Sequence, residues 1–194
     1  LAAVIVPVGF GISAVADELV PVLYGTQWLD MIPVLSMFGL SAAVRGSTAI
    51  ASPLFNSCDR AGLSFRYSLV GTAIMVAAVL IAMPHGIAMV AAAVALSSCY
   101  ALFALRASIA LIGLGTKDVW TLLGPPAVAA GVMWVIVRIV RPYVVDVLNS
   151  TGLILLVHVL LGASVYALVL HLCSRQYLRD FIDAGARLVK SRRL

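Results

Sequence analysis

The chain has 194 residues, of which 63% are hydrophobic and only 11% are charged, and its mean hydropathy is +1.11. An ordinary soluble domain has about a quarter of its residues charged, so this composition excludes that class and predicts an integral membrane protein. The formal net charge is +5, but six basic residues against two acidic ones fall within 175–194. The basic balance therefore describes a tail and excludes a nucleic-acid surface.

Six apolar segments follow one another along the chain, joined by short connections rich in Gly, Pro, Asn or charged residues. The segments are 16 to 26 residues long and show no alternation of polar and apolar residues, which favours helices over barrel strands. We predict an all-α fold, a polytopic membrane helix bundle of about six transmembrane helices. The predicted spans are 1–16, 29–54, 67–83, 86–105, 119–137 and 151–172.

The two ends of the sequence predict the domain organisation. The chain opens inside an apolar run without an initiator Met or a cleavage site, which indicates the C-terminal part of a longer protein. Residues 1–172 are expected to form the transmembrane lobe. Residues 173–194 place apolar and charged side chains on opposite helical faces and are predicted to form a basic amphipathic tail, held on anionic lipid or docked on a protein.

The distribution of Lys and Arg predicts the orientation. One set of alternate connections, taken with the tail, holds ten basic residues, whereas the other set holds only Arg138 and Arg141. Since cytoplasmic connections carry the excess of positive charge, the first set and the C-terminus are predicted to be cytoplasmic. The acidic pair Asp17 and Glu18 then lies outside.

The segment 29–54 carries a single arginine, Arg45, far from either end. In one continuous helix this guanidinium would lie near mid-membrane, where facing lipid costs from about 2.5 to more than 10 kcal/mol. Three hydroxyl residues share its helical face: Ser41, Thr48 and Ser52. The stripe is therefore predicted to face protein, water or an anionic ligand.

The connection after the first span has a distinctive order of residues. It reads Glu18-Leu-x-Pro-x-Leu-Tyr-Gly-x-x-Trp28. The acidic residue, the chain-breaking Pro and Gly, and the interfacial aromatics are generic features of a membrane surface, but their order is more specific. It resembles the polysaccharide and lipopolysaccharide (O-antigen type) flippases of the multidrug/oligosaccharidyl-lipid/polysaccharide exporter superfamily.

The resemblance extends over about residues 1–117. Such transporters carry an arginine within the next span, which Arg45 matches. They also carry a Leu-x-x-x-x-Gly-Arg turn, matched by 54–60 with Asp59 in the place of the glycine, and a Gly-x-x-Gly-Val-Ala entry to a span, matched by 86–91 with Met89 in the place of the second glycine.

The resemblance implies a function and a set of partners. The chain would be the C-terminal lobe of a multi-pass transporter in the bacterial inner membrane, working against an N-terminal lobe of the same chain. It would move an undecaprenyl-pyrophosphate-linked sugar repeat unit across the lipid bilayer by alternating access, without a cofactor. A guanidinium offers planar donors to pyrophosphate, so Arg45 is the candidate for headgroup binding. The alternative is a structural pairing with helix carbonyls or with a carboxylate of the other lobe.

Three further residues are weaker candidates for contact with substrate. Arg60 and Arg66 are typical of positive-inside residues. His158 is the only histidine well within a predicted span and can either relay protons or bond to a neighbouring helix.

No catalytic motif and no metal-ligand spacing occurs in the sequence, and the cysteines 58, 99 and 173 are scattered, so an enzyme with a site in this chain is not expected. Two alternatives stay open. One is a membrane enzyme of envelope polysaccharide assembly, a polymerase or acyltransferase, whose site lies upstream. The other is the permease half of an ATP-driven exporter. The upstream sequence and an ATPase encoded beside the gene would distinguish them.

Overall fold

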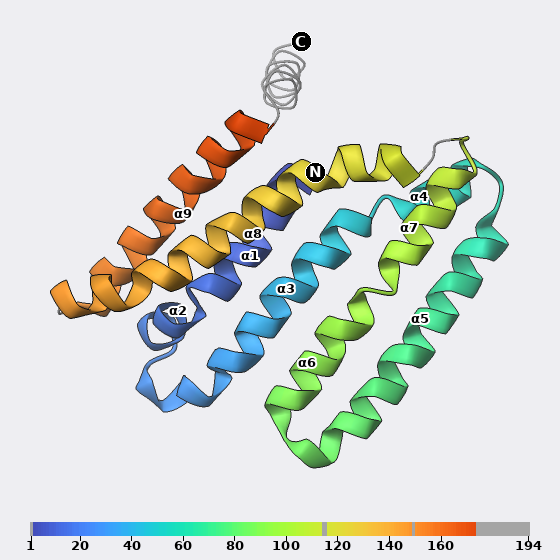
Figure 1. The fold of residues 1–194 in the computed structure, drawn as a ribbon. Coiled ribbons are helices and arrows are strands. Elements are labelled where there is room, and N and C mark those ends of the chain that lie inside the picture. The colour runs from blue at the N-terminus through green and yellow to red at the C-terminus, as the bar shows by residue number, and fades with distance from the viewer. Residues whose placement is uncertain (1, 114–115, 149, 174–194) are drawn as a thin grey trace, which may run out of the picture.

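The computed structural model describes residues 2–113, 116–148 and 150–173, and all regular secondary structure in this part is helical (Figure 1). The predicted all-α class is confirmed. The predicted tail lies outside the described residues, apart from position 173. The elements are α1 (Ala2–Ala14), α2 (Ala16–Leu23), η1 (Thr26–Met31), α3 (Ile32–Thr48), α4 (Ala51–Ser57), α5 (Ala61–Ala82), η2 (Met83–His85), α6 (Ile87–Ser98), α7 (Ala101–Ala110), α8 (Thr116–Val147) and α9 (Thr151–Cys173).

The long helices lie side by side in one row. Figure 1 shows the order α9, α8 with α1, α3, α6 and α5 across the molecule, and the packing contacts follow the same order. Helix α1 lies between α8 and α3, and its side chains are among the most buried. The turn between α2 and α3, the turn between α5 and α6, and the junction of α8 with α9 all lie at the same end of the helices, along one edge of the row.

Five helical stretches are long and apolar enough to cross a membrane. They are Thr26–Ser57, Ala61–His85, Ile87–Ala110, Leu123–Val147 and Thr151–Leu172. A sixth span results if α1 and α2 count together, although the chain bends by 76° between them. The chain is therefore a polytopic membrane protein. The prediction placed one straight span at 1–16 and did not include the bend after α1 or the second helix α2.

Two of the spans are broken rather than continuous. The predicted helix 29–54 is divided into η1, α3 and α4. The break between α3 and α4 precedes Pro53, which can neither donate to the carbonyl of Ala49 nor fit beside it in a regular helix. The predicted span 86–105 is divided into α6 and α7. There Ser97 and Ser98 both donate to the carbonyl of Val94, at 2.9 Å each, and such back-bonding bends helices.

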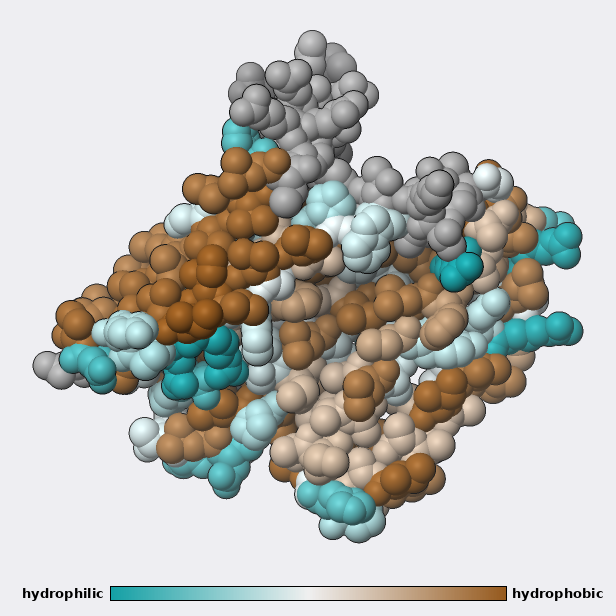
Figure 2. All heavy atoms as spheres, viewed as in Figure 1, coloured by the Kyte–Doolittle hydropathy of each residue, from teal (hydrophilic) through white to brown (hydrophobic). Residues whose placement is uncertain are grey.

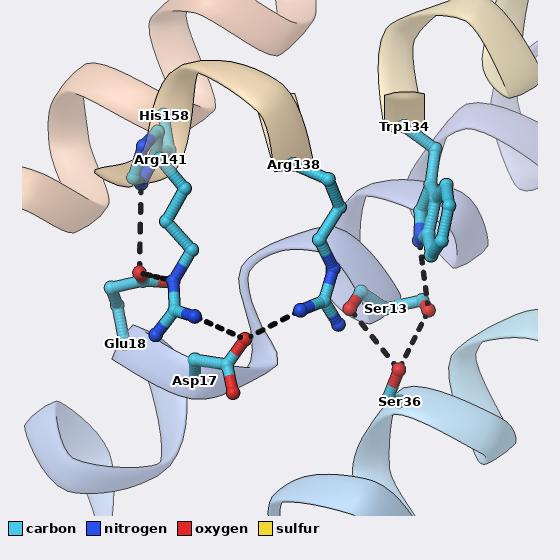
Figure 3. Close-up of polar contacts among 8 residues, drawn as sticks. All are labelled: Ser13, Asp17, Glu18, Ser36, Trp134, Arg138, Arg141 and His158. Carbon is cyan, nitrogen blue, oxygen red and sulfur yellow. Dashed lines mark hydrogen bonds and ion pairs between the residues drawn. The ribbon is translucent and has the colours of Figure 1, made fainter. Parts of the chain in front are cut away.

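Helix α8 continues to Val147, ten residues past the predicted end at 137. The predicted span ended just before Arg138, so Arg138 and Arg141 were expected in a connection. In the fold both guanidiniums pair with carboxylates (Figure 3). The pairing lowers the cost of a charge beside lipid, so the helix can continue through both arginines.

The turn before α5 has an unusual backbone conformation at Asp59. Its φ is +57°, in the left-handed region that glycine favours and that Asp tolerates better than most residues. Outside the glycines, no other described residue has a positive φ.

The outer surface of the row is strongly apolar. In Figure 2, hydrophobic side chains cover α8 and α9, and the hydrophilic ones gather mainly at the ends of the helices. Only 6% of the apolar window of Ala61–His85 is buried inside the fold, against 39% for Thr26–Ser57. Helix α5 therefore turns most of its apolar surface outward, as expected where a helix contacts lipid or another membrane-embedded segment.

Candidate functional site

Arg45 lines a polar cavity inside this apolar bundle. The cavity has a volume of about 290 Å³ and is bounded by α3 and α4 on one side and by α5, α6 and α7 on the other. Within the described part of the chain, Arg45 is its one charged lining residue and its side chain is exposed. The other polar lining residues all carry hydroxyls: Thr48, Ser52, Ser64, Tyr67, Ser68, Thr72, Ser97, Ser98 and Tyr100.

The cavity lies where the two broken spans come together. Helix α3 ends at Thr48 and α6 ends at Ser98, and both of these residues line it. At each break the chain turns through short-range bonds, from the amide of Ala49 to the carbonyl of Gly46 and from the amide of Tyr100 to the carbonyl of Ser97. Irregular backbone at membrane depth is tolerated where it lines a cavity or is buried in protein, and both breaks meet that condition.

The members of the predicted stripe are placed differently from one another. Ser41 is buried and shares a hydrogen bond of 2.7 Å with Ser98, so it joins α3 to α6 behind the cavity instead of lining it. The hydroxyl of Thr48 donates to carbonyls of its own helix at 3.1 Å. Ser52 bonds to Ser64 across to α5 at 3.0 Å. The guanidinium of Arg45 makes no hydrogen bond or ion pair with any residue that the structure describes.

Aromatic rings form one wall of the cavity. Phe55 stacks on Tyr67 with ring centroids 5.6 Å apart, and Tyr67 lies 6.3 Å from Tyr100. The ring of Tyr100 packs against Gly71 of α5, where a Cβ would lie only 3.1 Å from it. The glycine therefore leaves the space in which this ring lies.

The weaker candidates do not join this cavity. Arg60 and Arg66 are exposed on the turn before α5 and on α5 itself, and neither lines it. His158 is fully buried on α9, on the other side of α1 and α8, where it borders a separate, mostly apolar cavity of about 540 Å³. The structure thus brings Arg45 together with Thr48 and Ser52 but separates all three from His158.

A second polar cluster joins α2, α8 and α9 (Figure 3). Arg138 donates to Asp17 at 2.9 Å, and Arg141 donates to Glu18 through Nε at 2.7 Å while its Nη1 lies 3.4 Å from Asp17. Nδ1 of His158 lies 3.8 Å from Oε1 of Glu18, the same oxygen that Arg141 contacts. Helix α2 is therefore joined to α8 by ion pairs from both of its carboxylates.

A hydroxyl network continues this cluster into the core (Figure 3). Nε1 of Trp134 donates to Ser13 at 3.2 Å, and Ser13 shares a bond of 2.9 Å with Ser36 on α3. The guanidinium of Arg138 lies 5.5 Å from the centre of the Trp134 ring, a cation–π distance. The polar contacts thus connect α8, α1 and α3 in the plane of the membrane.

The sequence contained a signal for the charged cluster that the analysis of spans did not use. The predicted topology places Asp17 and Glu18 in one external connection and Arg138 and Arg141 in another. Two opposite pairs at the same end of a bundle are natural partners, because isolated charges are costly beside lipid. Their pairing across 121 residues follows from the packing of α1 against α8.

Within the described residues, no group of three or more His, Cys, Asp or Glu side chains is arranged to hold a metal ion. Cys58 and Cys99 carry free thiols. The polar chemistry of this part of the chain therefore consists of the Arg45 cavity and the charged cluster.

No protein-family model matches the chain, and no curated protein or solved structure matches it significantly.

Proposed function

We propose that the chain is one lobe of a flippase that moves a lipid-linked, anionic sugar carrier across a bacterial inner membrane. The observation that carries the proposal is the Arg45 cavity: one arginine, without a partner among the described residues, in a hydroxyl-rich space between spans. An arginine keeps its charge at every working pH, and an unpaired charge within a membrane-spanning segment is costly. A ligand that brings negative charge removes that cost.

The lining of the cavity suits a phosphate-containing headgroup. The guanidinium of Arg45 offers paired donors to two phosphate oxygens, and the hydroxyls of Ser68 and Thr72 add neutral donors. The rings of Tyr67 and Tyr100 offer flat apolar faces beside this polar centre. A headgroup that combines phosphate with sugar has the same combination of charge, hydroxyls and apolar ring faces.

The exposed apolar helices support a lobe that works with a partner. Helix α5 forms one wall of the cavity, yet most of its apolar surface faces outward. In the proposed transporter this surface meets lipid or the N-terminal lobe, and the cavity opens to alternate sides as the lobes rock against each other.

The proposed orientation has the C-terminus in the cytoplasm, as the positive-inside count indicates. The two arginines that weaken the count are Arg138 and Arg141, and both are paired with carboxylates. A neutralised arginine contributes less free positive charge to the outer side, so the pairing supports the same orientation.

The test is substitution of Arg45 in the full-length protein, expressed in a strain that lacks its own flippase, with surface polysaccharide measured at matched protein levels. Arg45→Ala is expected to lower output at least tenfold, and Arg45→Lys to restore only part of it, because an ammonium cannot make the bidentate contact. Arg66→Ala is the matched control, since Arg66 is exposed and lies outside the cavity. Normal output with Arg45→Ala would refute the role of this residue.

A further inference from the structure

The charged cluster contains a buried histidine whose place the Arg45 cavity does not explain. The side chain of His158 is 0% exposed, and neither ring nitrogen has a hydrogen-bond partner among the described residues. Oε2 of Glu18, whose side chain is 4% exposed, is likewise buried without a partner there. Buried polar groups are normally bonded, so two unbonded groups facing each other indicate a missing ligand or a second state.

We propose that Glu18 and His158 form a proton-binding site that ties α2 to α9 when it is occupied. The distance of 3.8 Å between Nδ1 of His158 and Oε1 of Glu18 is too long for a hydrogen bond. A proton on His158 makes both ring nitrogens donors and gives the ring a positive charge. The attraction to the Glu18 carboxylate then draws the two side chains into contact.

The charged side chains of this cluster sum to zero, so a proton on His158 adds a single net positive charge. The charged group in contact with His158 is Glu18 of α2, and the same cluster also contains Asp17 of α2 and Arg138 and Arg141 of α8. Two carboxylates and two guanidiniums cancel. From α1, the lining of the adjoining cavity contains no titratable residue, and on α9 itself the nearest one in that lining, Tyr166, donates to the carbonyl of Ala3 at 2.8 Å.

The burial of the cluster changes in steps that suit entry of a proton from one side. The side chains of Arg138 and Arg141 are 33% and 35% exposed, and that of Asp17 is 18% exposed. Glu18 follows at 4% and His158 at 0%. Glu18 therefore lies between the accessible part of the cluster and the buried imidazole, with one oxygen free to pass the proton on.

Occupation of the site has a mechanical consequence because of the helices it joins. Helix α2 is the short segment that bends away from α1 by 76°, and in this state Arg138 and Arg141 tie it to α8. A protonated His158 adds a third tie, to α9. The ends of α2, α8 and α9 are then held together. Protonation therefore favours a state in which these ends are closed, and loss of the proton favours a looser state, so a proton gradient can shift the lobe between the two whatever substrate is carried.

The experiment is nitrogen NMR of histidine-labelled full-length protein in lipid bilayers, between about pH 8 and about pH 5. The His158 signal is assigned by its loss in His158→Gln. In the wild type it is expected to change from the neutral to the imidazolium pattern as the pH falls. In Glu18→Gln, which keeps the shape but removes the charge, the imidazolium pattern is expected to be lost over the same range.

The matched control is Asp30→Asn, which removes an exposed carboxylate outside the cluster and should leave the imidazolium pattern in place. A neutral His158 throughout the range in the wild type overturns the proposal, and this result needs no folded variant. Proton uptake by Glu18→Gln equal to that of the wild type also overturns it. Neither result depends on the surface-polysaccharide assay, so the failure of one proposal is distinguishable from the failure of the other.

Discussion

Gly9 of α1 and Gly39 of α3 face each other where the two helices cross, so closely that a Cβ on Gly9 would lie 2.5 Å from the carbonyl oxygen of Gly39. A Cβ on Gly39 would lie 2.7 Å from the carbonyl oxygen of Gly9 and 2.9 Å from the amide nitrogen of Ser13. Small residues allow helix backbones to approach closely in membranes, and dispersion contacts then hold the pair together. This crossing fixes α3, and with it Arg45, relative to the centre of the row.

Gly9→Ala should therefore separate α1 from α3 and lower the free energy of unfolding by about 1–3 kcal/mol, the usual cost of overpacking. Thermal unfolding of the full-length protein in detergent measures the effect. Gly131→Ala on α8 is the matched control, because its Cβ would meet nothing within 4 Å and alanine favours the helix. Equal stability of the two variants would contradict the close crossing.

Gly71→Ala should impair transport more than it lowers stability. Its Cβ would lie 3.1 Å from the Tyr100 ring, which must then move from the wall of the Arg45 cavity. We expect a several-fold drop in surface polysaccharide at normal protein level. Gly62→Ala, on the same helix with nothing within 4 Å, should behave as the wild type. A Gly71→Ala protein with full output would show that the position of Tyr100 is unimportant.

Arg141→Gln should destabilise the fold because it leaves the buried Glu18 carboxylate without its 2.7 Å partner. Breaking a buried pair costs about 3–5 kcal/mol of the free energy of unfolding. Because Arg141 is partly exposed, we expect a loss of about 3 kcal/mol. Since the loss comes from an uncompensated charge, the double variant Glu18→Gln/Arg141→Gln should recover much of it. Chemical unfolding of the three variants tests the pair as a double-mutant cycle. Additive effects of the two substitutions would argue against the pairing.

Asp59→Gly should raise stability, whereas Asp59→Val should lower it. A φ of +57° destabilises an L-residue by about 1–2 kcal/mol. Glycine has no such cost, whereas a β-branched residue has the full cost. Unfolding midpoints of the full-length protein measure both changes. Asp30→Gly is the control, because Asp30 does not have a positive φ and gains nothing from glycine. Destabilisation by Asp59→Gly would mean that the Asp side chain itself stabilises the turn.

Part of the Arg45 site could be predicted from the sequence, because helical spacing alone puts Thr48 and Ser52 on the face of Arg45. Ser41, which the same spacing puts on this face, does not line the cavity and instead shares a hydrogen bond with Ser98. The opposite wall could not be predicted at all. Ser68 and Thr72 belong to α5, and Tyr100 lies at the break between α6 and α7. The rotation of these helices about their own axes depends on packing, and their weak amphipathicity gives no local signal for it.

The sequence by itself determined the class of this protein, its helical spans and the presence of a costly arginine within one of them. These are local properties, because hydropathy and helix geometry depend on neighbours along the chain. Only the tertiary structure decided which charges meet. Asp17 and Arg138 lie 121 residues apart in the chain and 2.9 Å apart in space, and their pairing depends on the packing of α1 against α8. That packing is also why Arg138 and Arg141 can remain in helix α8, where the sequence alone predicted an end.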